Sequence, residues 1–288
     1  MKIAGVVVLY HPEKENIIES INSYLDYIDV LYAIDNTEKS NEKHREVINN
    51  LKEIDKIEYI PNNKNLGIAK ALNMGAKRAI EQGYKWLLTM DQDSKFKEGS
   101  FDKMLEFIKN NSENKIGIIS PFHLTISNLS LNFKNEYEEV LTAMTSGNLL
   151  NLKAYQEVGP FLEDLFIDYV DVEYCLRLNK YGYKVIVVNS SILIHKLGNI
   201  REIRIPLWKT LYPTNHNPLR RYYITRNRFY VMELYKNEFP DFCKRDKIAF
   251  FKELATILLL ENSKLTKLKY IIKGYMDFRQ KKMGKIDE

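Results

Sequence analysis

Two aspartates one residue apart, Asp91 and Asp93, follow directly after the apolar run Trp86–Met90. Carboxylates at positions i and i+2 beyond the end of a strand can turn toward one cation. Mg²⁺ and Mn²⁺ prefer such oxygen ligands and commonly take phosphate oxygens as the others. An acidic turn that caps the next segment explains the same two residues without a metal. The pair therefore indicates a metal and phosphate site only in company with other residues.

A second acidic group lies near residue 170, where Asp168, Asp171 and Glu173 fall within six residues among large apolar side chains. On a helix, Asp168 and Asp171 would share one face, because residues three apart are neighbours there. Acids near a helix N-terminus also cap it and favour its dipole, but capping does not need three of them. A carboxylate in this setting can serve as a general base that takes a proton from an attacking hydroxyl.

His195 ends the apolar run at residues 191–194. A lone histidine at the end of a strand is more often structural than a ligand. Imidazole is nevertheless an acceptable metal ligand, and His195 stands where a third contact could come from a separate strand.

Strands and helices alternate in the first half of the chain, and this pattern indicates a parallel α/β sheet. The strands are predicted at residues 3–9, 30–34, 57–60 and 86–90. The helices are predicted from Ile17 to Ile28 and from Leu66 to Gln82, the second closed by Gly83. Ligands of open α/β sheets bind at the carboxyl ends of the strands, so the polar residues there should line one edge. These residues are Tyr10, His11, Asp35, Asn36, Thr37, 62–67 and 91–93.

The second half of the chain is mixed and then helical. Strands are predicted at residues 116–119, 141–150, 184–188 and 192–195, with a helix at 169–181. After Pro206 the pattern is mostly helical to the end. We therefore expect an α/β domain at residues 1–205 and a helical C-terminal extension at residues 206–288.

Composition excludes several classes of protein. The 288 residues contain only two cysteines, so neither a disulfide framework nor a metal–thiolate cluster is expected. The N-terminal apolar run has no cleavage site after it, and the most apolar late stretch, 248–260, falls short of the roughly 20 residues of a membrane span. These features favour a cytoplasmic protein, and no nucleic-acid partner is expected.

Lysines concentrate after Lys236, interleaved with Phe, Leu and Ile, within a formal net charge of +5. A basic amphipathic segment of this kind can lie on an anionic membrane surface. It can equally be a set of solvated helix faces, which is the commoner case.

The order and spacing of these motifs resemble the family 2 glycosyltransferases, and within them the bacterial rhamnosyltransferases. The resemblance covers nearly the whole chain. Its motifs are VVVLYHP at 6–12, DNT at 35–37, NNKNLGIAKALNMG at 62–75, MDQDS at 90–94, TSGNLL at 145–150, VGPF at 158–161, LFIDYVDVEYCLR at 165–177, HKLG at 195–198 and HNPLRRYYITRN at 216–227. Single pieces are weak evidence, but their common order is specific.

The resemblance implies the GT-A fold, with a nucleotide-sugar half at about residues 1–95 and an acceptor half at about 96–205. Asp91, Asp93 and His195 would bind Mg²⁺ or Mn²⁺. The residues implied around the donor are Tyr10, His11, Asp35, Asn36, Asn65, Gly67, Ala69, Asp91, Gln92 and Asp93.

The base implied by the resemblance is Asp171, six residues before Arg177, with Asp168 as the weaker candidate. Many members of the family have a Glu-Asp pair where Val170 precedes Asp171 here. This departure matches the rhamnosyltransferase subgroup, and it leaves the choice between the two aspartates open.

The implied reaction is a single displacement with inversion, from dTDP-L-rhamnose to a surface-polysaccharide or cell-wall precursor on a polyprenyl diphosphate. Such an acceptor places the enzyme at the inner membrane face, as a peripheral protein, which fits the basic tail. Arginine forks match phosphates, so part of the cluster Arg220, Arg221 and Arg226 is expected to hold a donor or acceptor diphosphate.

Two alternatives remain. One is the same fold with a UDP-hexose donor, such as UDP-galactose or UDP-N-acetylglucosamine. The other is an α/β protein that only binds nucleotides or transfers nucleotidyl groups. A nucleotidyltransferase would carry a glycine-rich loop with an arginine after its first strand, where Tyr10–Glu13 stands here. A simple binding module would not need the acids around Asp171.

Overall fold

A computed structural model of the chain describes residues 1–39, 42–49, 51, 53–111, 115–125, 133–195, 203–204, 210–211 and 213–286. The chain forms two compact units, the first comprising residues 1–166 and 170–196 and the second residues 167–169 and 197–288. We call them the α/β unit and the helical unit. The domain boundary predicted between residues 205 and 206 falls within residues 205–209, which lie outside the described part.

Four parallel strands form one side of the sheet in the α/β unit, in the order β3-β2-β1-β4. They are β1 (Ile3–Leu9), β2 (Val30–Asp35), β3 (Ile57–Pro61) and β4 (Trp86–Asp91). The strand β1 lies inside this group and is almost wholly buried, as its continuous apolar run predicts. All four strands predicted in the first half are confirmed.

The sheet continues through five more strands, several of them antiparallel. They are β5 (Lys95–Phe96), β6 (Ile116–Leu124), β7 (Tyr137–Val140), β8 (Asn148–Asn151) and β9 (Lys184–Ile194). The strand β8 runs antiparallel to both β4 and β6, whereas β6 and β9 are parallel. The short strands β5 and β7 both pair with β9.

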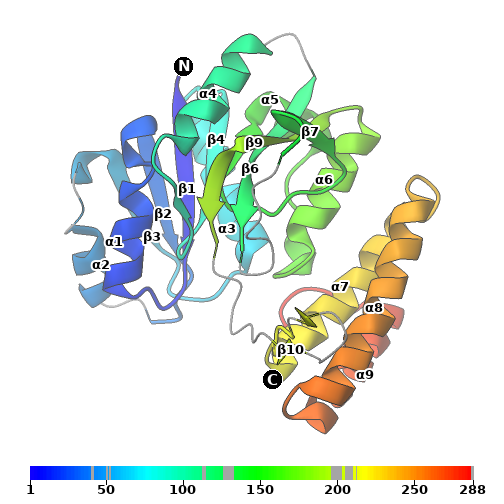
Figure 1. Ribbon diagram of the computed structural model, residues 1–288. Helices are drawn as coiled ribbons and strands as arrows, with labels where there is room; N and C mark the ends of the chain where they lie inside the picture. Colours follow the sequence, from blue (N-terminus) through cyan, green and yellow to red (C-terminus); the bar gives the residue numbers. More distant parts are fainter. Residues whose placement is uncertain are drawn as a thin grey trace. The chain divides into compact units, whose positions relative to one another are not determined.

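Helices cover both faces of this sheet (Figure 1). Val7 packs in one core cluster with side chains of α1 (Lys14–Asn22), α2 (Glu42–Asn49) and α4 (Ser100–Asn110). Val6 faces the other way, because side chains alternate along a strand. It meets α3 (Ile68–Glu81), where a Cβ on Gly75 would lie only 2.6 Å from Val6 Cγ2. The unit also contains α5 (Leu152–Val158), α6 (Val170–Lys180) and three 3₁₀ turns at Leu25–Tyr27, Ile54–Lys56 and Glu163–Leu165.

Several predicted elements are wrong in extent. Of the strand predicted at 141–150, only the end is extended, because Gly147 turns the chain with φ +82° before β8. The two strands predicted around residues 184–195 are one strand, whose register against β6 shifts between Val188 and Ile192. The first predicted helix ends at Asn22, and a 3₁₀ turn follows it.

The helical unit contains α7 (Pro218–Tyr235), α8 (Pro240–Leu260) and α9 (Lys264–Arg279), with the short pair β10 (Ile203–Arg204) and β11 (Thr210–Leu211). Asn217 caps α7 by accepting a hydrogen bond from Arg220 N, and Pro218 stands in its first turn. Gly274 lets α9 approach α7, since a Cβ there would lie 2.5 Å from Tyr222 O. Among the described helices, none combines the length and apolarity that a membrane span requires.

Candidate functional site

Asp91, Asp93 and His195 come together in the α/β unit, although about a hundred residues separate the histidine from the aspartates. One ligand atom from each residue lies within 4.8 Å of the others. Asp91 ends β4 and His195 follows the end of β9, so two strands that are not neighbours supply the group.

This donor set fits a divalent metal. Two carboxylates and an imidazole are ligands that Mn²⁺ and Mg²⁺ accept. Asp93 is exposed, whereas Asp91 and His195 are partly buried. A cation held here would therefore keep an open side for water or phosphate oxygens.

Serine hydroxyls form hydrogen bonds with two of these candidate metal ligands. Ser94 Oγ lies 2.6 Å from His195 Nδ1, and Ser94 itself is fully buried. Asp91 N donates to Ser146 Oγ at 3.1 Å. The main chain of Ser94 is held in turn by Ser20 Oγ, which donates to its carbonyl at 2.5 Å. Hydrogen bonds thus fix both the backbone of the first aspartate and the ring of the histidine.

His123 contacts the backbone of Ser146, the residue whose hydroxyl binds Asp91 N. Its Nε2 lies 2.7 Å from Ser146 O, and because a carbonyl only accepts, this nitrogen carries the proton. Burial lowers the pKa of His123 to about 4, so the ring is neutral near pH 7. Its ring meets that of His195 edge to face, with centroids 5.9 Å apart.

Gln92 joins the loop of the two aspartates to the end of β1. Its Oε1 accepts from Tyr10 N at 2.8 Å, and its Nε2 donates to Tyr10 O at 3.0 Å. Gln92, which was predicted to bind the nucleotide-sugar donor, therefore holds the backbone of Tyr10 in place. Tyr10 and His11 are themselves exposed.

Asp35 and Asn36 lie deeper than the sequence pattern suggests. Asp35 is fully buried and accepts hydrogen bonds from Thr37 N at 2.9 Å and Tyr59 OH at 2.6 Å, with His44 Nδ1 at 3.0 Å. Burial opposes the charge of Asp35, but these hydrogen bonds outweigh it and lower its pKa. Asn36 Nδ2 donates to Gly67 O at 3.0 Å. In this structure both residues brace the edge of the sheet.

The loop before α3 is closely fitted. Asn65 Oδ1 accepts from Gly67 N at 3.0 Å, and Ile68 N donates to Phe166 O at 2.7 Å. Gly67 adopts φ +83° against Phe166. Ala69 is fully buried in the first turn of α3, so its side chain is not at the surface where a donor could meet it.

The acidic motif does not form one helix face, which corrects the sequence expectation for Asp168 and Asp171. Asp168 and Tyr169 have φ of +60° and +65°, and α6 therefore begins only at Val170. Glu173 is buried and pairs with Arg177, with Oε2 and Nη2 2.7 Å apart. This third acid of the motif is structural.

Asp171 lies in the first turn of α6 and is partly buried. Its side chain lines a small cavity that Thr89 of β4 and Thr145 also line. The next residue after Thr145 is Ser146, whose hydroxyl binds Asp91 N. The loop at 145–146 thus connects the surroundings of Asp171 with those of the candidate metal-ligand group Asp91, Asp93 and His195.

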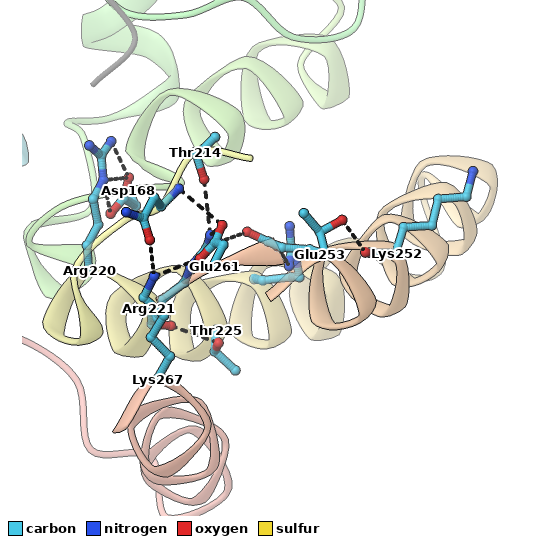
Figure 2. Close-up of polar contacts among 12 residues, drawn as sticks. Asp168, Thr214, Arg220, Arg221, Thr225, Lys252, Glu253, Glu261 and Lys267 are labelled. Carbon is cyan, nitrogen blue, oxygen red and sulfur yellow. Dashed lines mark hydrogen bonds and ion pairs between the residues drawn. The ribbon is translucent and has the colours of Figure 1, made fainter. Parts of the chain in front are cut away.

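The three arginines proposed for a diphosphate differ from one another. Arg221 and Arg226 are buried within the helical unit. Arg221 pairs with Glu253 and Glu261, as Figure 2 shows, so its charge is already matched there. Burial leaves no surface on which these two could meet a diphosphate, and we assign both a structural role. Arg220 remains 45% exposed and pairs with Asp168.

Sequence reasoning gave no role to Ser94, Ser146 or His123. The serines stand inside the quoted motifs MDQDS and TSGNLL, so the signal was present, but their partners are distant in sequence. His123 was missed because the strand was predicted to end at residue 119, whereas β6 runs to Leu124.

Comparison with known proteins agrees with this geometry. Residues 5–126 match the model of Glycosyl transferase family 2. The chain carries a family 2 glycosyltransferase domain. It is also 28% identical over 289 residues to the dTDP-rhamnosyl transferase RfbF of Shigella flexneri, covering 94% of this chain and 92% of that protein. These matches confirm the expectation of a rhamnosyltransferase-like protein of family 2.

Solved structures share the fold. S. aureus TarS 1-349 in complex with UDP-GlcNAc matches with a TM-score of 0.62 and 14% identity, over 97% of this chain and 81% of that chain. GalNAc-T7 with UDP, GalNAc and Mn²⁺ matches with a TM-score of 0.61 and 14% identity. The match covers 98% of this glycosyltransferase chain and only 56% of GalNAc-T7. At such identities the likeness shows the fold alone, and the predicted GT-A class is confirmed.

Proposed function

We propose that this chain is an inverting, metal-dependent rhamnosyltransferase that transfers L-rhamnose from dTDP-L-rhamnose to a lipid-linked polysaccharide precursor. The observation that carries the proposal is the convergence of Asp91, Asp93 and His195 at the edge of a family 2 fold. The donor is suggested by the likeness to a dTDP-rhamnosyl transferase over nearly the whole chain.

Different residues of the α/β unit bind the metal, present the donor site and accept the proton. Asp91, Asp93 and His195 would hold Mg²⁺ or Mn²⁺, which when bound offsets the charge that builds on a departing nucleoside diphosphate. Gln92 presents Tyr10 beside them through two hydrogen bonds to its backbone. Asp171 takes the proton of the acceptor hydroxyl as that oxygen attacks the anomeric carbon.

Asp171 is a better candidate for the base than Asp168. The Asp168 carboxylate is gripped by Arg220, with Nη2 3.0 Å and Nε 3.2 Å from Oδ1. Burial raises the pKa of Asp168 despite this ion pair, but the guanidinium occupies both carboxylate oxygens and so competes with an acceptor hydroxyl for them. Asp171 Oδ1 accepts from Val172 N, at 2.8 Å, in its own helix turn.

The choice of base is tested by comparing Asp171→Asn with Asp168→Asn. We expect the first variant to lose about 10²–10⁴-fold in the turnover number for transfer, as expected for loss of a general base. The second should retain much more activity, because asparagine also tolerates φ near +60°. Near-normal turnover by Asp171→Asn would exclude it as the base.

The metal and the donor are tested together with purified protein. Turnover is measured for dTDP-L-rhamnose, UDP-galactose and UDP-N-acetylglucosamine with Mn²⁺, Mg²⁺ or a chelator. Asp91→Ala and Asp93→Ala should abolish metal-dependent nucleotide binding, whereas the exposed Asp55→Ala should not. Turnover of a UDP-hexose in place of dTDP-L-rhamnose would favour the alternative donor, and binding without any turnover would favour a nucleotide-binding protein.

The acceptor side of the proposal includes a membrane surface. On α8 the apolar side chains Ile248, Phe251 and Leu259 are 47%, 58% and 74% exposed. They lie along one helix stripe, at i, i+3 and i+11, and the exposed Lys244 and Lys252 border it. Exposed apolar residues beside lysines complement an anionic lipid surface, where a polyprenyl-linked acceptor would be held.

Vesicle binding tests this surface. The full chain should bind vesicles of phosphatidylglycerol more strongly than vesicles of phosphatidylcholine, and the double variant Phe251→Ser, Leu259→Ser should lose most of that binding. A matched double variant, Tyr181→Ser with Ile54→Ser, removes exposed apolar side chains of the α/β unit and should bind as the parent does. Equal binding of the parent to both vesicles, or no binding, would contradict the membrane proposal.

A further inference from the structure

The backbone just before Asp171 accepts two hydrogen bonds from a buried side chain of the helical unit. Asn227 Nδ2 donates to Ile167 O at 2.7 Å and to Asp168 O at 2.9 Å. Asn227 lies in α7 and is fully buried. Residues 167–169 belong to the helical unit by their contacts, although α6 and Asp171 follow them directly in the chain.

Arg226 determines which way the Asn227 amide faces. Arg226 Nε donates to Asn227 Oδ1 at 3.0 Å, and a guanidinium has no acceptor. The amide oxygen therefore points to Arg226, which leaves the NH₂ group for the two carbonyls. Arg226 is itself fixed by Gly284 O, at 2.6 Å, and by the ring of Tyr223, whose centroid is 5.1 Å from Cζ.

The side chains of the same segment are held as well. The Asp168 carboxylate pairs with Arg220, as Figure 2 shows. The hydroxyl of Tyr169 donates to the Asp246 carboxylate at 2.9 Å and accepts from Arg228 Nε at 2.6 Å. Burial raises the pKa of Tyr169, so the phenol keeps the proton that it donates.

This segment needs such support because its backbone is unfavourable. Asp168 and Tyr169 have φ of +60° and +65°, which costs on the order of 1 kcal/mol or more for each residue. Conformations of this kind persist only where the surroundings over-determine them. Only Val170 separates Tyr169 from Asp171, so the backbone at Tyr169 leads directly into the first turn of α6, where Asp171 lies.

We infer that Asn227 is a positioning residue for the base, and that Arg226 and Arg220 support it in this role. Together these residues hold residues 167–169 in the backbone conformation from which α6 begins. The inference rests on the proposed role of Asp171. It also gives a purpose to the arginines of the HNPLRRYYITRN motif that is different from diphosphate binding.

The test is a double-mutant cycle between Asn227→Asp and Asp171→Asn. A carboxylate at 227 cannot donate to the two carbonyls, so we expect a fall of about 10²-fold in kcat, the scale of a misplaced catalytic group. The KM for the donor and the metal-dependent nucleotide affinity should change less than threefold, because the metal ligands are untouched. In the Asp171→Asn background, Asn227→Asp should cause no further loss.

Controls separate positioning from general damage. Asn237→Asp makes the same chemical change at an exposed site just beyond α7 and should be neutral. Arg220→Gln changes a partly exposed side chain and should not disturb folding. It should lower kcat by about threefold to tenfold and leave the nucleotide affinity unchanged. The loss is smaller than that of Asn227→Asp, because Asn227 would still hold the backbone that leads to Asp171.

The outcomes are distinct. Unchanged kcat in both Asn227→Asp and Arg220→Gln would overturn the inference. The inference would also be overturned if the double variant lost kcat by the product of the two single losses. Asn227 would then act independently of the base. Full activity of Asp171→Asn would instead overturn the proposed function.

Discussion

Ser94 Oγ and His195 Nδ1 lie 2.6 Å apart, and this contact orients the ring of a candidate metal ligand. Histidines that bind metals usually donate their other ring N–H to an oxygen nearby, which fixes the tautomer and the ring orientation. When Nδ1–H donates to Ser94, the lone pair of Nε2 is left for a metal. Ser94 comes immediately after Asp93, so one short segment supplies both a ligand and the support of another.

We therefore predict that Ser94→Ala lowers the affinity for Mn²⁺ by about 10–100-fold, the usual effect of removing a partner that orients a ligand. Isothermal titration of Mn²⁺ in the presence of nucleotide measures it. Ser191→Ala is the matched control, because the Ser191 hydroxyl is buried in β9 and has no hydrogen-bond partner among the described residues. Equal affinity of the two variants would show that Ser94 does not support the site.

Gly67→Ala should destabilise the α/β unit by about 2–4 kcal/mol, through positive φ and a collision together. A Cβ at Gly67 would lie 2.6 Å from Phe166 O, and the residue has φ +83°. Gly83→Ala separates the two causes, since Gly83 has φ +77° but nothing within 4 Å of the added atom. We expect it to cost only about 1 kcal/mol in urea unfolding. Equal losses would mean that the collision with Phe166 is unimportant.

Arg221→Met should destabilise the helical unit by about 3–5 kcal/mol, because the buried Glu261 and the partly buried Glu253 each lose one of their two cationic partners. Arg221 is 2% exposed and pairs with Glu261, itself 1% exposed, with Nη2 and Oε1 2.8 Å apart. The exposed Arg279→Met, in α9, should change stability by less than about 0.5 kcal/mol. Thermal unfolding followed by circular dichroism compares them. A small effect of Arg221→Met would mean that Lys267, which also pairs with Glu261, is sufficient.

His216 should make the helical unit sensitive to acid. Burial, with the nearby Arg220 and Arg221, lowers its pKa from 6.5 to about 4. The unfolded chain therefore binds the proton more readily than the folded chain between these values. The stability that neutral His216 provides is complete above pH 6.5 and is lost as the pH falls toward 4.

The variant His216→Asn should accordingly lose less stability between pH 7 and pH 4.5 than the parent does. Unfolding in urea at several pH values measures the difference. An NMR titration of the parent protein gives the pKa directly, and the His216 imidazole signal is identified as the one that is missing from the variant. A midpoint near 6.5 for that signal would contradict the prediction.

The sequence by itself determined the first four strands, the helix α3 and the three metal-ligand candidates. Apolar runs and helical spacing are local patterns, and β1 to β4 each follow from a few consecutive residues. Asp91 and Asp93 stand at the end of such a run, and the rule for parallel sheets then predicts the edge at which they meet a ligand. The resemblance to a known family then favoured a metal-binding role for His195 over a structural one.

Tertiary structure alone decided the backbone at Asp168 and Tyr169, the burial of Arg221 and Arg226, and the partner of His195. A helix was predicted to include Tyr169 because local propensity cannot register contacts with Asn227 or Arg228, which lie about sixty residues away. The arginines of α7 resemble phosphate ligands in sequence, and only packing shows that carboxylates, amides and aromatic rings already surround them. Hydrogen bonds between distant residues depend on how the elements pack, and no spacing along the chain encodes that.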